Sequence, residues 1–231
     1  MHPHEMFEQL MSPDFAGDGR LPNDFLSFLG PRYPPERVVD LLRSSNWHTR
    51  AAGAFLATFL KPEVVTGFKF ELGALLDEPS SRVRMDAIEA LRDCVTPYDG
   101  PLLGRLLLLL DSDHPADHYS VTLFIRLVHD GVLKAAATNA AVLRPESAFA
   151  QIASDLRNKT YLSRAGIARS LQSEHRAVRR FAAAMAGRAR LVINEHLLEL
   201  VENADDLEVR KMAAISRKHP VPTWAVLSSE L

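Results

Sequence analysis

The chain has 231 residues, of which 47% are apolar and 24% are charged, and its formal charge is −2. This composition is typical of a packed protein, and a charge so near zero gives no overall field that would draw the chain to nucleic acid or an anionic membrane. The single cysteine, Cys94, excludes an internal disulfide. Apolar runs such as 106–110 are too short to span a membrane, and we expect a cytoplasmic protein.

The first 33 residues contain helix-breaking residues and no long apolar pattern. Pro13, Pro22, Gly30 and Pro31 interrupt this stretch, and both residue types weaken helices. We predict an irregular arm over residues 1–33, with a short helix over 24–29, which caps the rest of the chain.

One spacing recurs from residue 34 onward. A leucine is followed eight positions later by a polar or basic residue, in Leu42…Arg50, Leu76…Arg84, Leu110…His118 and Leu171…Arg179. The first three copies lie 34 residues apart, and a constant period of this size is typical of stacked helix pairs. The sequence therefore predicts an array of helical repeats over 34–219.

Helix-start signals divide this array into six antiparallel helix pairs. Pro34, Asn46 and Pro115 are residues that favour the first positions of a helix. After a first helix that starts at residue 34, the remaining first helices are predicted over 63–76, 102–110, 132–143, 161–171 and 192–201. The second helices are predicted over 46–60, 81–94, 115–128, 146–156, 175–188 and 207–217. A last short helix over 223–229 should lie in a capping segment, 220–231.

Each predicted second helix carries an apolar stripe that a neighbouring pair must cover. In the first pair, Ala51, Phe55 and Phe59 recur every four residues, and we expect them to be buried, with Trp47 packed between helices. Phe124 and Phe181 lie on the stripes of later second helices. No stretch shows the alternating pattern of a half-buried strand.

Four segments at the starts of second helices resemble the HEAT repeat family in its short bacterial form. Segments 83–87, 178–183 and 209–214 each begin with Val-Arg and continue to alanine, and 50–52 is a shorter version. The resemblance covers residues 34–218. It implies an all-α, right-handed α-solenoid with its second helices on the concave side, and a protein that serves as a scaffold or binding module. The 21 arginines against 6 lysines favour a bacterial source.

A local excess of basic residues follows in the later repeats. Residues 156–190 contain nine basic residues and one acidic residue, whereas residues 1–154 contain 14 basic and 20 acidic residues. A solvated helix surface and a binding surface both explain this excess. On the second reading, an acidic partner surface is recognised by six residues: Arg84, His118, Arg176, Arg180, Arg188 and Lys211. Within this set, Arg84 resembles a structural arginine of the repeat, and Arg176 and Arg180 should be freer.

Chemistry other than binding has little support in the sequence. His114 and His118 stand four residues apart, a spacing that suits a metal ion, but Pro115 separates them and no glutamate follows as in zinc proteases. DNA glycosylases of related architecture use aromatic residues in a basic groove, and the two tryptophans, Trp47 and Trp224, lie at opposite ends of this chain. We therefore expect no metal, no cofactor and no catalytic residues.

The sequence thus favours a non-catalytic scaffold that binds a protein, as an adaptor or as an immunity protein that blocks a toxin. The alternative is a nucleic-acid-binding or DNA-repair protein of the glycosylase type that uses the basic residues of 157–190. The salt dependence of binding separates the two, because phosphate contacts release counterions.

Overall fold

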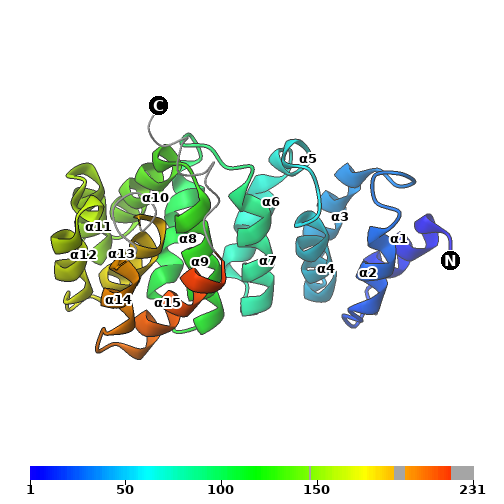
Figure 1. Cartoon of the computed structure of the whole chain (residues 1–231). Helices are drawn as coiled ribbons and strands as arrows, with labels where there is room; N and C mark the ends of the chain where they lie inside the picture. Colours follow the sequence, from blue (N-terminus) through cyan, green and yellow to red (C-terminus); the bar gives the residue numbers. More distant parts are fainter. Residues whose placement is uncertain (146, 190–195, 220–231) are drawn as a thin grey trace. The chain divides into compact units, whose positions relative to one another are not determined.

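A computed structural model describes residues 1–145, 147–189 and 196–219 of the chain (Figure 1). Of these residues, 72% are helical, and the described part contains one isolated bridge, Leu29–Tyr33, and no strand. The helices divide into two compact units, Met1–Val95 and Thr96–Leu231. The predicted all-α solenoid class is confirmed, and each of the six predicted pairs is represented by helices. Residues 220–231, where a capping helix was predicted, lie outside the described residues.

The arm of unit 1 is more helical than the sequence predicts. It contains α1 (Pro3–Met11) and α2 (Arg20–Leu26), so the predicted helix over 24–29 begins and ends too late. His2 and Glu5 form a capping box at the start of α1, which satisfies N–H groups that the first turn leaves unbonded. Phe7, Phe25 and Tyr33 then pack together with ring centroids 4.9 to 6.0 Å apart, and this cluster holds the two helices.

Two helix pairs follow in unit 1. The first consists of a 3-10 turn (Pro35–Arg37), α3 (Val38–Leu42) and α4 (Trp47–Ala57). The second consists of α5 (Pro62–Thr66), α6 (Lys69–Ala74), a 3-10 turn (Leu75–Asp77) and α7 (Ser81–Arg92). The helix predicted over 63–76 is therefore broken at Gly67 and Phe68, because glycine favours a helix end and the Phe68 side chain is buried there.

Four helix pairs form unit 2. They are α8 (Gly100–Leu108) with α9 (Pro115–Leu127), α10 (Asp130–Leu143) with α11 (Ala148–Arg157), α12 (Arg164–Leu171) with α13 (Arg176–Ala189), and α14 (Leu197–Glu202) with α15 (Leu207–Lys218). Short 3-10 turns, Leu109–Asp111 and Thr160–Leu162, extend α8 and precede α12.

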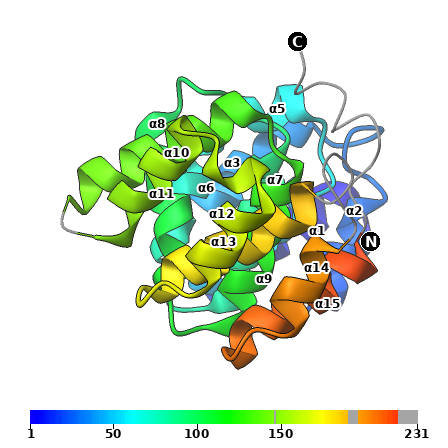
Figure 2. The same cartoon turned by 60° about the vertical axis from the view of Figure 1, so that its left-hand side comes forward.

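The second pair of unit 2 departs from a regular stack. Helix α13 packs directly against α9 and α15, whereas α10 packs along α8, and α11 packs on α10 and α13 (Figure 2). Glycine permits the close approach of α8 and α10, since a Cβ at Gly104 would lie 2.8 Å from the backbone of Asn139. The second helices of unit 2 therefore follow in the order α9, α13, α15.

Burial confirms the predicted stripes of the later repeats and contradicts part of the first one. Phe124 and Phe181 are completely buried. In contrast, Phe59 is 56% exposed and Trp47 is 48% exposed, so the prediction that they pack inside is wrong for both. Phe59 follows the end of α4, and Trp47 is its first residue.

Candidate interaction surface

The recurring polar residue fixes the loop between the two helices of its own pair in five of the six described pairs, all except α10–α11. In Arg50, Arg179 and Arg210, Nη1 donates to the carbonyl oxygens six and five residues earlier, at 2.6 to 3.0 Å. Arg84 makes the same two bonds, to Glu78 O and Pro79 O. Such bonds satisfy carbonyl groups that would otherwise lack donors.

Two of these arginines also connect successive repeats. Arg50 Nε donates to Glu78 at 2.7 Å, and Arg179 Nε donates to Asp206 at 2.9 Å. In the third repeat, His118 takes the arginine's place, and its Nε2 lies 2.6 Å from Ser112 O, again six residues earlier. The spacing that the sequence shows is therefore the signature of a structural contact, and Arg84 and His118, both about 5% exposed, are occupied by it.

The three arginines of the predicted basic surface on α13 are also engaged inside unit 2. Arg176 pairs with Asp111 at 2.8 Å and Asp113 at 2.6 Å. Arg180 donates to the carbonyl oxygens of Leu110 and Ser112, and Arg188 donates to those of Ile125 and Val128 and pairs with Asp130 at 2.6 Å. The hydrogen bond from Arg176 lowers the pKa of Asp113.

Only part of this surface faces solvent as the sequence suggests. Arg180 is 6% exposed, so its expected place at the rim of a groove is wrong: α9 covers it, since α13 packs directly on that helix. Burial lowers the pKa of Arg180. Lys211 is exposed and pairs with Glu208 at 2.7 Å. A role of these residues in partner binding stays a prediction.

The two histidines that suggested a metal ion do not meet in a ligand set. His114 is the N-cap residue of α9, and His118 is bonded to Ser112. Among the described residues, no group of three or more His, Cys, Asp or Glu side chains is placed to hold a metal ion. Cys94 is a buried free thiol, and Trp224 lies outside the described residues.

A cleft of about 410 Å³ opens beside α4 in unit 1. Its apolar lining includes Trp47, Ala51, Phe55 and Phe15. Three of these residues recur every four positions along α4, which places them on one face of the helix. An ion pair between an exposed arginine and a buried aspartate closes one side, where Arg82 Nε donates to the carboxylate of Asp86 at 3.1 Å.

The arm forms the opposite wall of this cleft, and α4 holds it there. Asn46 Nδ2 lies 2.9 to 3.4 Å from the carbonyl oxygens of Ser12, Pro13 and Phe15, and Thr49 Oγ1 donates to Leu10 O at 2.8 Å. Gly17 adopts φ +81° and packs so close to His48 that a Cβ would lie 2.2 Å from its ring. The wall is therefore fixed by specific contacts, which the sequence interpretation missed because it treated the arm as irregular.

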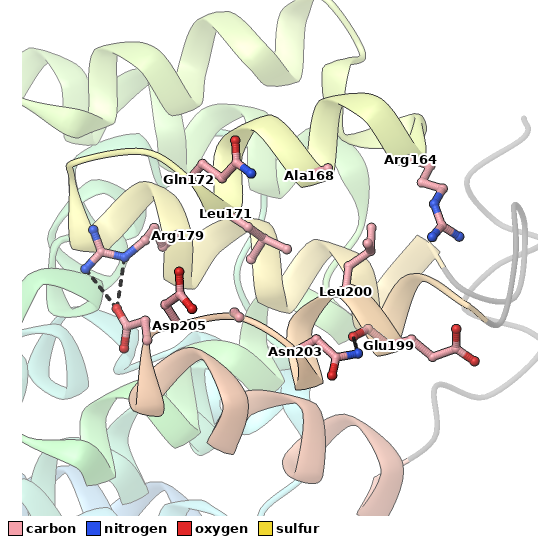
Figure 3. A pocket seen from close by; sticks show the side chains of 11 residues that line it. Arg164, Ala168, Leu171, Gln172, Arg179, Glu199, Leu200, Asn203 and Asp205 are labelled. Carbon is pink, nitrogen blue, oxygen red and sulfur yellow. Dashed lines mark hydrogen bonds and ion pairs between the residues drawn. The ribbon is translucent and has the colours of Figure 1, made fainter.

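A second hollow lies in unit 2 between α12 and α14 (Figure 3). Its volume is about 780 Å³. Ala168, Leu171 and Leu200 form an apolar floor, and charged and amide side chains surround it. Sequence reasoning did not detect this hollow, because its residues come from two successive pairs, mostly from α12, α14 and the segments that follow them.

Comparison with known proteins supports the fold and does not assign a family. No family model and no curated protein matches the chain. The crystal structure of an engineered protein is similar with a TM-score of 0.53, at 14% identity, over 94% of this chain and 97% of that one. Two designed armadillo repeat proteins, one in complex with a (KR)4 peptide, give TM-scores of 0.49 at 15% and 16% identity, over 94% of this chain and 98% and 99% of theirs.

Proposed function

We propose that this protein is a non-catalytic helical-repeat scaffold that binds another protein, and that the cleft beside α4 is its main contact. The observation that carries the proposal is the half-exposed Trp47 at the mouth of a cleft lined by one face of α4. Large aromatic side chains are the residues that most often dominate binding energy at protein interfaces.

The construction of the cleft supports a binding role over a chance exposure. The arm is held in place by four side-chain hydrogen bonds from Asn46 and Thr49. Because the arm is fixed, it cannot move further over Trp47 and Phe55 to bury them. A preformed apolar cleft also loses little conformational entropy when a partner segment enters. We infer that the partner presents an apolar side chain to Trp47 and Phe55.

The partner class follows from how the charges are used. Of the α13 arginines, Arg176, Arg179 and Arg188 are paired with carboxylates of the same unit and Arg180 is buried. This weakens the case for nucleic acid, whose binding rests on free cations facing phosphates. An acidic partner surface remains a proposal for Arg176, which is half-buried, and for Lys211, which is exposed. Both an adaptor in a larger assembly and a toxin-blocking immunity protein fit a scaffold of this kind.

Affinity capture from a lysate of the source organism, followed by mass spectrometry, tests the proposal. The wild type and Phe70→Ala, which changes a side chain that is 69% exposed outside the cleft, should retain the same partner. Trp47→Ser should lose it, with unchanged circular dichroism. A partner retained equally by all three proteins, or a retained partner that nuclease treatment removes, contradicts the proposal.

A further inference from the structure

The hollow between α12 and α14 has unused charges at opposite ends, and Figure 3 shows Arg164 at one end and Asp205 at the other. Both side chains are exposed. Within the described part of the chain, neither side chain has a hydrogen bond or an ion pair. The other charged side chains around the hollow, Arg179, Glu199 and Asp206, are in ion pairs. Arg164 and Asp205 therefore make one end of the hollow positive and the other end negative.

The other three charged side chains around the hollow all have partners within unit 2. Arg179 uses all its nitrogen atoms on Asp206, Ser173 O and Glu174 O. Burial alone would raise the pKa of Asp206, but hydrogen bonds from Arg179 and from two backbone N–H groups hold it below its usual range. Glu199 pairs with His196 at 2.7 Å. Among the described residues, the Asp205 carboxylate therefore has no ion-pair partner, although Arg210 donates to the Asp205 carbonyl oxygen and the neighbouring Asp206 is paired.

The floor and rim between these charges match an extended polypeptide. Leu171 and Leu200 offer apolar contact, while the Gln172 side-chain amide makes no hydrogen bond among the described residues. Asn203 Nδ2 donates to Glu199 O at 2.8 Å, which leaves its Oδ1 for another donor. Extended main chain exposes N–H and C=O groups that such amides can pair.

The length of the hollow sets the spacing of charges on its occupant. The hollow runs the length of α12, from Arg164 to Gln172. At 1.5 Å per helical residue this is about 12 Å, and at roughly 3.3 Å per extended residue it accommodates about four residues.

We propose that this hollow binds a short extended protein segment carrying an acidic side chain at Arg164 and a basic side chain, three or four residues away, at Asp205. The segment's apolar residue packs on Leu171 and Leu200 between the two charges. This adds a second contact, with its own chemistry, to the proposed scaffold role, and it does not depend on the cleft at Trp47.

A peptide array tests the proposal with the full chain. The probes are acetylated, amidated pentapeptides built from one Glu, one Lys and three residues chosen from Leu, Ser and Ala, in every order, with sets in which Gln replaces Glu or Lys. The wild type should prefer peptides whose Glu and Lys are three or four positions apart. Arg164→Glu and Asp205→Lys should each weaken binding of these peptides at least tenfold, and the double variant should restore it.

Two controls separate this site from a general charge effect and from the cleft. Arg157→Glu changes an exposed arginine on α11 and should leave peptide binding unchanged, as should Trp47→Ser. No charge-spacing preference in the wild type, equal losses in Arg164→Glu and Arg157→Glu, or a double variant as weak as the single ones would each overturn the proposal. A wild type that elutes as a dimer and becomes a monomer in Arg164→Glu would assign the hollow to a second copy instead, and would also overturn it.

Discussion

Helices α4 and α13 hold the same position in their repeats, but α4 carries half-exposed aromatic residues where α13 carries paired arginines. Arg50 and Arg179 make equivalent bonds to the loops before their helices, so residues at the same offset from them correspond. Three residues before the arginine stands Trp47 in α4 and Arg176 in α13, and nine residues after it stand Phe59 and Arg188.

The difference lies in the neighbour that each helix has. In unit 2, α9 packs against α13. At these positions Arg176 donates to Asp111 O in the turn before α9, and Arg188 donates to the carbonyl oxygens of Ile125 and Val128 at the C-terminal end of α9. In unit 1, the arm stands beside α4, and the corresponding side chains are aromatic and half exposed. The same repeat position therefore holds helices together where another repeat packs against it, and it is half exposed where only the arm stands beside it.

The largest expected effect comes from the buried half of this comparison. Phe181→Ala should lower the free energy of unfolding by about 3–5 kcal/mol, because Phe181 is completely buried and packs on Tyr161 with ring centroids 5.0 Å apart. Phe59→Ala is the matched control and should change it by about 0.5 kcal/mol or less, as exposed residues do. Urea melts of both variants measure this, and equal losses would show that the two faces are not different.

The buried arginine gives the next largest effect. Arg180→Met keeps the apolar contacts of the stem but leaves Leu110 O without its guanidinium donor. Because an unsatisfied buried carbonyl costs roughly 1–3 kcal/mol, we expect a loss of stability in that range. Arg157→Met, on an exposed arginine, should cost little. If Arg180→Met is as stable as the wild type, the arginine is available for a partner, and the sequence-based interpretation of the basic surface regains support.

The wall of the unit 1 cleft supplies a smaller test. Gly17→Ala should destabilise the chain by about 1 kcal/mol or more, because alanine disfavours the positive φ and its Cβ would meet His48. Gly19→Ala, in the same loop but with no atom within 4 Å of its Cβ position, should be neutral. The fluorescence of Trp47 should shift in the first variant and not in the second. Identical melts would mean that the arm is not fixed against α4.

Sequence reasoning predicted the fold further than it predicted the site. The 34-residue spacing identified the repeats because Arg50 and its counterparts make a contact that every copy needs. The same reasoning failed for Arg180, since charge composition does not show that α13 packs on α9 as well as on α11 of the intervening pair. It also failed for Trp47, because an apolar stripe predicts a covering neighbour but not which repeat lacks one.

The smallest effect concerns the histidine that replaces an arginine in the third repeat. Burial lowers the pKa of His118, and the Arg180 charge adds to this, while the Ser112 carbonyl and Glu208, whose carboxylate lies 3.6 Å from Nδ1, oppose it. The unfolded chain therefore binds this proton more readily than the folded chain, so stability falls as the pH drops below about 6.5, the ordinary value for histidine. His118→Gln removes the titrating group and retains an amide donor for Ser112 O. The difference in unfolding free energy between wild type and variant should be constant above pH 7 and should shift in favour of the variant between pH 7 and 5, while the remaining titrating groups cancel. A difference that does not change with pH would show that His118 has the same pKa in the folded and the unfolded chain, and would contradict the prediction.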